Sequence, residues 1–176
     1  MSGSQGPAGP DRTDGHGFTH LDAAGHARMV DVTAKQPTVR SATAEGLVVC
    51  AADVVAALRS GDVPKGDVLA VARVAGISAA KRTAELLPLA HVIGVHGVVV
   101  DLEVRDDGVA VRATVRTADR TGVEMEALTA VSVAALAVVD MVKGMDKGTS
   151  IANVRLTEKT GGKSGDWHRP ADDRDL

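Results

Sequence analysis

The feature that most constrains this chain is a run without a single charged side chain, from Ala127 to Val139. The run consists of Ala, Val and Leu, with Thr129 and Ser132 as its polar members. The residues from Thr121 to Glu124 have the pattern of a capping box, which predicts that a helix begins near Val123. Because apolar residues surround this helix, we expect it to be buried on most sides, with charges only at its two ends.

The two charged ends of this helix are too far apart to meet at one small substrate. Glu126 and Asp140 are fourteen residues apart, so they share a face to within ~40° but lie ~21 Å apart along the axis. Two copies packed antiparallel about a two-fold axis would bring the start of each helix to the end of the other. The spacing therefore predicts a site that is shared between subunits.

Composition excludes several classes of function. Aromatic residues make up 1% of the chain and the net charge is −3, which argues against nucleic-acid binding. Cys50 is the single cysteine, so no disulfide framework is expected. The uncharged run is shorter than a membrane span and the N-terminus lacks an apolar signal segment. We expect a cytoplasmic protein with no nucleic-acid and no membrane partner.

The domain organisation follows from length and from local composition. Residues 1–17 are rich in Gly, Pro and Asp, and we expect them to be disordered. We expect residues 18–167 to form a single domain and residues 168–176 to form a flexible C-terminal tail. With 44% apolar residues, the chain can bury a sizeable aliphatic core.

The predicted elements follow one another as strand, helix, hairpin, helix and strand. Their expected positions are a strand at 40–49, a helix capped by Asp53 that ends at Gly61, a helix from Asp67 to about Leu87 before Pro88, a hairpin of 98–104 and 109–115, and a strand at 151–157. Gly76 should mark a close helix contact or a kink. In the hairpin, Val109, Val111, Ala113 and Val115 should face inward, and Arg116 outward. This order predicts an α+β, ferredoxin-like β-α-β-β-α-β fold, with helices packed on one face of an antiparallel sheet.

Basic residues beside glycine suggest a phosphate-bearing ligand. Lys65 and Gly66 precede a predicted helix N-terminus, where free N–H groups and the helix dipole favour anions. Lys159 and Lys163 flank Gly161 and Gly162 near the end of the chain. For each lysine taken alone, an ordinary solvated surface position is the favoured explanation, and the occurrence of several beside glycine shifts the balance slightly toward a phosphate-bearing ligand.

The remaining candidates also have plain structural explanations. His91 follows a predicted helix at a position suited to an acid–base group, although a loop histidine without such a role fits as well. Its spacing to other ligand types predicts no metal site. Glu126 can simply favour the helix dipole, and Asp140 can simply pair with Lys143 three residues on. Charges next to an apolar core nevertheless tend to have shifted pKa values, which acid–base catalysis uses.

Four segments closely resemble the MoaC family, the cyclic pyranopterin monophosphate synthases of molybdenum cofactor biosynthesis. They are THLDAAGHARMVDVTAK, PKGDVLAVARVAGISAAKRTAELLPLAH, RTADRTGVEMEALTAVSVAALAVVDMVK and EKTGGKSGDW, and together they extend from about Thr19 to Trp167. The resemblance implies a lyase that converts a cyclised dihydroguanosine triphosphate into cyclic pyranopterin monophosphate and releases diphosphate. It further implies dimers assembled into a homohexamer and a site at the dimer interface. We expect no cofactor and no metal ligands among the site residues, and the sequence leaves open whether a divalent metal accompanies the phosphates.

The resemblance also assigns roles to residues at matching motif positions. Asp140, Lys65 and Lys143 are the implied catalytic residues. The implied substrate-binding residues are His91, Glu124, Met125, Glu126, Arg40, Arg116 and Lys159. Among these, Arg40, Arg116 and Lys159 are expected to hold phosphate.

One segment departs from the family pattern. Where members usually carry Leu-Cys-His-Pro, this chain has Leu89-Ala90-His91-Val92, followed by Ile93 and Gly94. The lost proline and the added glycine free the backbone after His91. Two other functions are therefore weighed against catalysis: a homologue that serves as a binding or assembly module, and a nucleotide-sensing regulatory domain.

Overall fold

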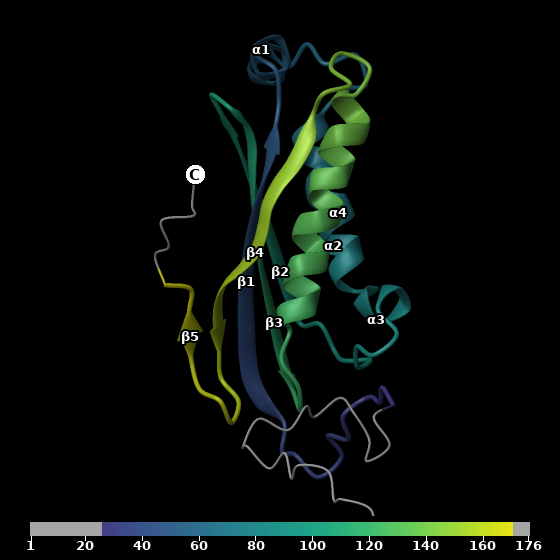
Figure 1. Ribbon diagram of the computed structural model, residues 1–176, viewed down its shortest axis with the longest axis vertical. Coiled ribbons are helices and arrows are strands. Elements are labelled where there is room, and N and C mark those ends of the chain that lie inside the picture. The colour runs from purple at the N-terminus through teal and green to yellow at the C-terminus, as the bar shows by residue number, and fades with distance from the viewer. Residues whose placement is uncertain (1–25, 171–176) are drawn as a thin grey trace, which may run out of the picture. The chain divides into compact units, whose positions relative to one another are not determined.

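The computed structural model describes residues 26–170 (Figure 1). Segment 1–17, which we expect to be disordered, and residues 171–176 of the expected tail lie outside the described residues. The chain divides after Asp31 into two units. The second unit begins at Val32 and contains all the helices and strands defined among the described residues.

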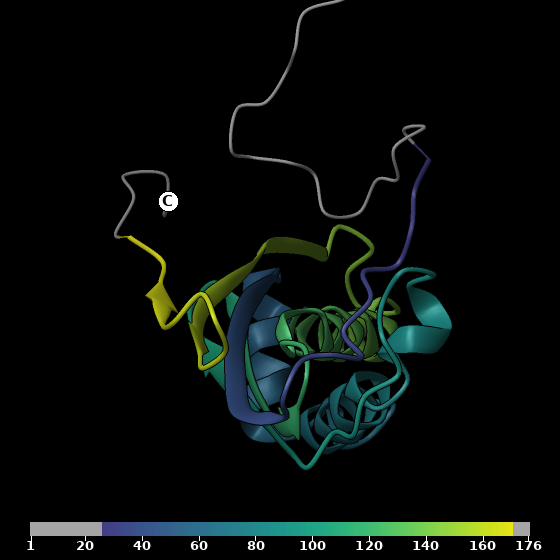
Figure 2. The ribbon, with the colours of Figure 1, turned by 90° about the horizontal axis from the view of Figure 1, so that it is seen from below.

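Nine elements make up the described part of this second unit. Their bounds are β1 Thr38–Val49, α1 Ala52–Ser60, α2 Val68–Ala80, α3 Thr83–Leu86, β2 Gly97–Arg105, β3 Gly108–Asp119, α4 Glu124–Val142, β4 Ser150–Thr160 and β5 Trp167–His168. The strands form one antiparallel sheet in the order β2-β3-β1-β4-β5. The long helices α2 and α4 lie side by side on the same face of this sheet (Figures 1 and 2). The predicted α+β, ferredoxin-like fold is confirmed.

The hairpin of β2 and β3 is confirmed with its predicted faces. Val109, Val111, Ala113 and Val115 are buried, because alternate residues of a strand face the same side of the sheet. Gly108, at the end of the turn, has a φ of +145° and lies against the carbonyl group of Val48. A side chain there would collide with that backbone, so the position requires glycine.

Strand β5 was not predicted. It contributes two residues, Trp167 and His168, which pair with Lys159 and Glu158 of β4. Two residues show no alternation, so sequence periodicity could not reveal the strand. Just beyond it, the N–H group of Arg169 donates to the carbonyl oxygen of Thr157 at 2.8 Å.

Of the two predicted N-cap residues, Asp67 of α2 is confirmed and Asp53 of α1 is not. Asp67 caps α2 as predicted, since its carboxylate accepts the N–H group of Ala70 at 2.9 Å. The prediction that Asp53 caps α1 was wrong, because Ala51 is the N-cap residue and Asp53 lies in the first turn. Gly61, with a φ of +79°, ends α1 as predicted.

Two further helix predictions need correction. A single helix from Asp67 to Leu87 was wrong: α2 stops at Ala80 and α3 is separate. The buried hydroxyl group of Thr83 donates to the carbonyl oxygen of Ala80 at 3.1 Å, a local bond that competes with helix continuation. The capping box before α4 does not form, because Val123 is the N-cap residue and no side chain caps the helix.

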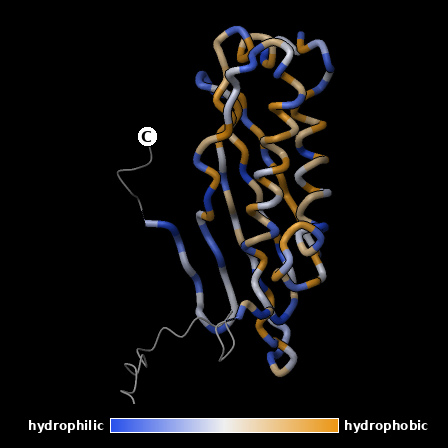
Figure 3. Tube along the Cα trace, turned by 45° about the vertical axis from the view of Figure 1, so that its right-hand side comes forward, coloured by the Kyte–Doolittle hydropathy of each residue, from blue (hydrophilic) through white to orange (hydrophobic). Residues whose placement is uncertain are grey.

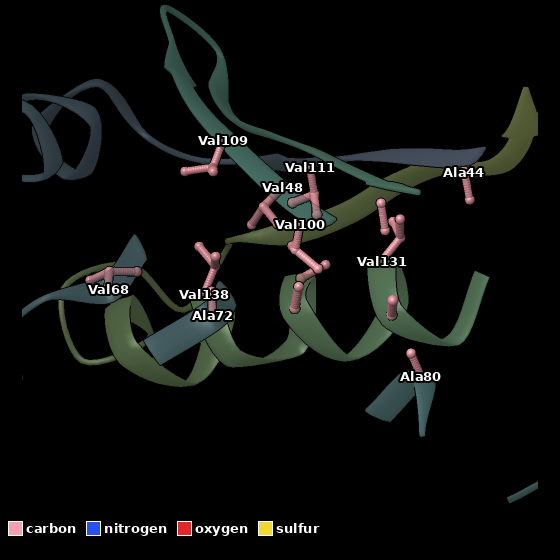
Figure 4. Packing of buried hydrophobic residues seen from close by; sticks show 14 of the residues in the cluster. Ala44, Val48, Val68, Ala72, Ala80, Val100, Val109, Val111, Val131 and Val138 are labelled. Carbon is pink, nitrogen blue, oxygen red and sulfur yellow. The ribbon is translucent and has the colours of Figure 1, made fainter. Parts of the chain in front are cut away.

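Helix α4 is the centre of the apolar core (Figure 4). Ala130, Val131, Ala134 and Val138 are fully buried on its inner faces. Two glycines let its neighbours approach: a Cβ atom on Gly46 of β1 would lie 2.9 Å from the Val131 side chain, and one on Gly76 of α2 would lie 2.9 Å from the Ala130 carbonyl oxygen. Gly76 therefore marks the close helix contact that was one of its two predicted roles. Figure 3 shows this apolar layer as the orange and tan stretches of the helices.

The expectation that no apolar stretch reaches membrane-spanning length needs one correction. Helix α4 has 19 residues and is, among residues 26–170, the one helix long and apolar enough to cross a membrane by length and composition. Its small apolar residues pack against the sheet and α2. Its composition is accounted for by the core of this domain.

Replacing Gly76 with valine should lower the free energy of unfolding by about 1–3 kcal/mol, because the added carbons must separate α2 from α4. Urea unfolding followed by circular dichroism would measure the change. Ser78→Val places the same side chain at an exposed position of α2 and is the matched control. An equal loss in both variants would contradict the role of the close contact between α2 and α4.

Candidate functional site

The predicted site residues fall into two groups, one at each end of α4. Near its C-terminus lie Asp140 and Lys143 of α4, joined by Lys65 from the segment between α1 and α2. Near its N-terminus lie Glu124 and Glu126, with Lys159 of β4. We call these the C-terminal cluster and the N-terminal cluster.

In the C-terminal cluster, two lysines surround one carboxylate. The Lys143 ammonium lies 2.8 Å from Oδ1 of Asp140, and the Lys65 ammonium lies 3.2 Å from Oδ2. Lys65 also donates to the backbone carbonyl oxygen of Asp140 at 2.5 Å, in the last turn of α4, where the helix dipole favours a cation. Hydrogen bonds from Lys143 and Lys65 hold the pKa of Asp140 below its usual range.

The chain around Lys65 explains how this residue reaches α4. Gly66 has a φ of +93°, a conformation that glycine adopts readily, and Asp67 then caps α2. The turn before α2 therefore has a fixed shape, and it presents Lys65 to α4, 75 residues further along the chain. The C-terminal cluster has an excess of positive charge, which suits a phosphate-bearing ligand.

In the N-terminal cluster, Glu124 is held by the end of β4. The Lys159 ammonium lies 3.3 Å from Oε1 of Glu124 and donates to the hydroxyl group of Ser164 at 2.9 Å. The Glu124 carboxylate also lies against Gly122, so a side chain at that position would have to displace it. Ser164 is a contact that the sequence analysis missed, although it lies within the GGKSGDW motif that carried the resemblance.

Glu126 is the buried member of the N-terminal cluster, with 4% of its surface exposed. Burial raises the pKa of this carboxyl group, and the nearby negative charge of Glu124 adds to the rise. A hydrogen bond from its own backbone N–H group and the charge of His91 act in the opposite direction and lower the pKa. A carboxyl group with a raised pKa keeps its proton to a higher pH than an ordinary glutamate, which suits a proton donor.

Arg40 and Arg116 lie on opposite faces of the sheet. Arg40 is on the helix-covered face of β1 and donates from Nε to the backbone carbonyl oxygen of Asp119 at 3.0 Å. Gly162, with a φ of +79°, lies directly against its guanidinium group. Arg116 is exposed and points outward, as predicted from the alternation in β3. Within one chain, Arg116 therefore joins neither cluster.

The two clusters remain apart within one chain. Glu126 and Asp140 are separated by fourteen residues of continuous helix, or ~21 Å. Met125, next to Glu126, and Leu136, between Glu126 and Asp140, are exposed on α4. The structure thus gathers most of the predicted residues into two separate clusters, and Arg116 lies outside both.

One hollow on the surface contains no predicted site residue. It measures about 530 Å³ and lies on the open face of the sheet, where Glu45, Asp101, Arg112 and Arg155 contribute to its lining. Among residues 26–170, no three His, Cys, Asp or Glu side chains are grouped as a metal ion would need.

A family model and several similar proteins indicate the same family. The model of the MoaC family matches residues 29–162. A protein of Streptomyces coelicolor is 60% identical over 169 residues, covering 96% of this chain and 99% of the relative. One of a Nocardioides species is 63% identical over 156 residues (87% and 96%), and one of Geobacter sulfurreducens is 53% identical over 154 residues (86% and 96%). All three relatives are named cyclic pyranopterin monophosphate synthase.

The raised pKa of Glu126 predicts a specific dependence of stability on pH. The folded state binds the proton more tightly than the unfolded state, so this contribution is fully present below the ordinary glutamate pKa and is lost as pH rises through the folded pKa. Glu126→Gln removes the dependence, so the variant should gain stability relative to the wild type as pH rises through this range. Urea unfolding between pH 4 and 8 measures the difference.

The exposed substitution Glu103→Gln serves as the control for loss of one negative charge. A difference between the Glu126→Gln variant and the wild type that stays constant with pH would contradict the effect of burial on Glu126.

Proposed function

The chain belongs to the MoaC family, and we propose that it acts as a cyclic pyranopterin monophosphate synthase through a site that two subunits share. The enzyme is a lyase of molybdenum cofactor biosynthesis. It converts (8S)-3',8-cyclo-7,8-dihydroguanosine 5'-triphosphate into cyclic pyranopterin monophosphate and releases diphosphate. It requires no cofactor in this proposal, and the chain's own side chains supply the charge and the protons.

The observation that carries the proposal is the pairing of Asp140 with two lysines. Lys65 and Lys143 approach different oxygens of one carboxylate, which remains ionised to an unusually low pH. A triphosphate brings several negative charges, and fixed ammonium groups stabilise the charge that develops at phosphorus when diphosphate leaves. Asp140 orients the lysines and can exchange protons with the reacting ring. These three residues are the proposed catalytic group.

The N-terminal cluster supplies the complementary chemistry. Its buried Glu126 favours the protonated form and can donate a proton during ring opening. His91 and Glu124, beside it, offer polar contacts to the pterin-forming base, and Met125 offers an exposed apolar contact. Lys159 and Arg40 are the proposed phosphate contacts on this side.

Arg116 is the proposed phosphate contact that one chain cannot deliver. It is exposed on the sheet face away from the helices, so it can reach a substrate only at a contact with another subunit. This residue therefore links the proposal to the assembly.

A stripe along the outer side of α4 supports antiparallel pairing of two copies. Met125 and Leu136 are 44% and 57% exposed, whereas Thr129 and Ser132 are half-buried. A two-fold axis between residues 132 and 133 would place Met125 opposite Asp140 of the other copy, and Thr129 opposite Leu136. The same operation brings each N-terminal cluster to the C-terminal cluster of the other copy. Pairing would cover the exposed apolar side chains and complete two equivalent sites.

The proposal also covers the oligomeric state and the cellular location of the protein. Three such dimers would form the homohexamer implied by the family resemblance, in the cytoplasm. The main competing function is a catalytically impaired homologue that binds the nucleotide or assists assembly. The paired lysines favour catalysis, because binding alone does not need two cations on one carboxylate at the end of a core helix.

Lys65→Ala tests the proposed chemistry. Incubated with the cyclic triphosphate, the purified variant should release diphosphate about 100-fold more slowly than the wild type or worse, since one lost donor at a developing charge typically costs that much. Lys147→Ala removes an exposed lysine four residues beyond Lys143 and should retain full activity. Near-normal release by Lys65→Ala would refute its role, and substrate binding without turnover by the wild type would favour the binding module.

A further inference from the structure

The segment that carries His91 has little regular structure of its own. Between the end of α3 and the start of β2, residues 87–96 contain one backbone turn, in which Ala90 donates to Leu87 at 3.0 Å. Val92, next to His91, is 92% exposed. Regular secondary structure therefore does not fix this segment, whose His91 lies close enough to Glu126 for its charge to lower the pKa of that carboxyl group.

Three consecutive residues at the end of β3 hold this segment from outside. The Thr117 hydroxyl donates to the carbonyl oxygen of Gly94 at 2.6 Å. The Asp119 carboxylate accepts the N–H group of the same glycine at 3.3 Å. Between them, the Ala118 N–H group donates to Nδ1 of His96 at 3.1 Å. Both polar backbone groups of Gly94 are thus satisfied by side chains of one strand, and we call this arrangement the Gly94 clamp.

Burial, close packing and charge each favour the hydrogen bonds of the Gly94 clamp. Thr117 is 3% exposed, so its hydroxyl group has a fixed partner and not a solvent molecule. A Cβ atom on Gly94 would lie 3.3 Å from the His96 ring, closer than side chains normally pack, so a larger residue would disturb the third contact. Asp119 also accepts the N–H group of Arg120 at 2.7 Å. Hydrogen bonds from Arg120 and Gly94 lower the pKa of Asp119, which keeps this acceptor ionised.

We propose that Thr117 and Asp119 are positioning residues for the reaction: by clamping Gly94, they fix the segment that carries His91. The inference rests on the proposed function for the role of His91 in binding substrate, but not for the clamp itself. Neither residue touches substrate in this account. The clamp restrains a backbone that has neither regular secondary structure nor, after His91, the proline usual in the family.

The test compares Thr117→Val with Thr117→Ser. Valine has the shape of threonine but no hydroxyl group, so KM for the cyclic triphosphate should rise about fivefold to tenfold, which corresponds to the loss of one hydrogen bond. The C-terminal cluster is unchanged, so kcat should change less than KM. Serine restores the donor and should restore KM. Thr114→Val removes a threonine hydroxyl of the same strand that bonds Thr43 on the other face, and it should leave KM unchanged.

A double variant separates positioning from general damage to the fold. If Thr117 acts through His91, then Thr117→Val should change KM by less than about twofold in a His91→Ala background. Equal effects in both backgrounds would overturn the proposal. Asp119→Asn, which weakens the second contact without changing shape, should behave like Thr117→Val and provides the test if the latter fails to fold.

Amide hydrogen exchange tests the clamp independently of turnover. Exchange at Gly94 and at His91 should accelerate in Thr117→Val and not in Thr114→Val. Unchanged exchange would overturn the clamp even in an active enzyme. Faster exchange in a protein that shows no turnover would refute the proposed function while supporting the clamp.

Discussion

The close packing of α4 between the sheet and α2 is the constraint on which the rest of the structure depends. Its inner residues are alanine and valine, and Gly46 and Gly76 supply the space for the contact. A charge on the faces of this helix that pack against the sheet and α2 would carry a large desolvation cost. All of the ionisable groups of α4 are at its ends, so the proposed functional chemistry is divided between two places in each chain.

The two ends of α4 shift the pKa values of their carboxyl groups in opposite directions. Asp140 is exposed and bonded to two lysines, which lower its pKa, whereas burial raises the pKa of Glu126. One group is thus suited to remain a carboxylate and the other to hold a proton. An enzyme that must both stabilise phosphate charge and move protons needs both. This division is the physical reason behind the proposed pairing of two subunits at α4.

Sequence reasoning succeeded where a pattern is local. The uncharged run predicted α4, the alternation of Val109 to Val115 predicted β3, and Asp67 was correctly placed as a cap. It failed where no local pattern marks the change: α2 ends at Ala80 before the separate helix α3, and β5 is defined by its pairing with β4. The site residues could be named by resemblance, but the contact from Lys65 to Asp140 spans 75 positions and required the structure. The Gly94 clamp has no sequence signature at all.

The most direct test of the shared site is subunit complementation. Lys65→Ala disables the C-terminal cluster and Lys159→Ala disables the N-terminal cluster, and each variant alone should be nearly inactive. When the two are co-expressed and pair at random, half of the dimers are mixed and each mixed dimer has one intact site, so about a quarter of wild-type activity should return. Activity no greater than that of the separate variants would show that each site is built from a single chain, which contradicts the account.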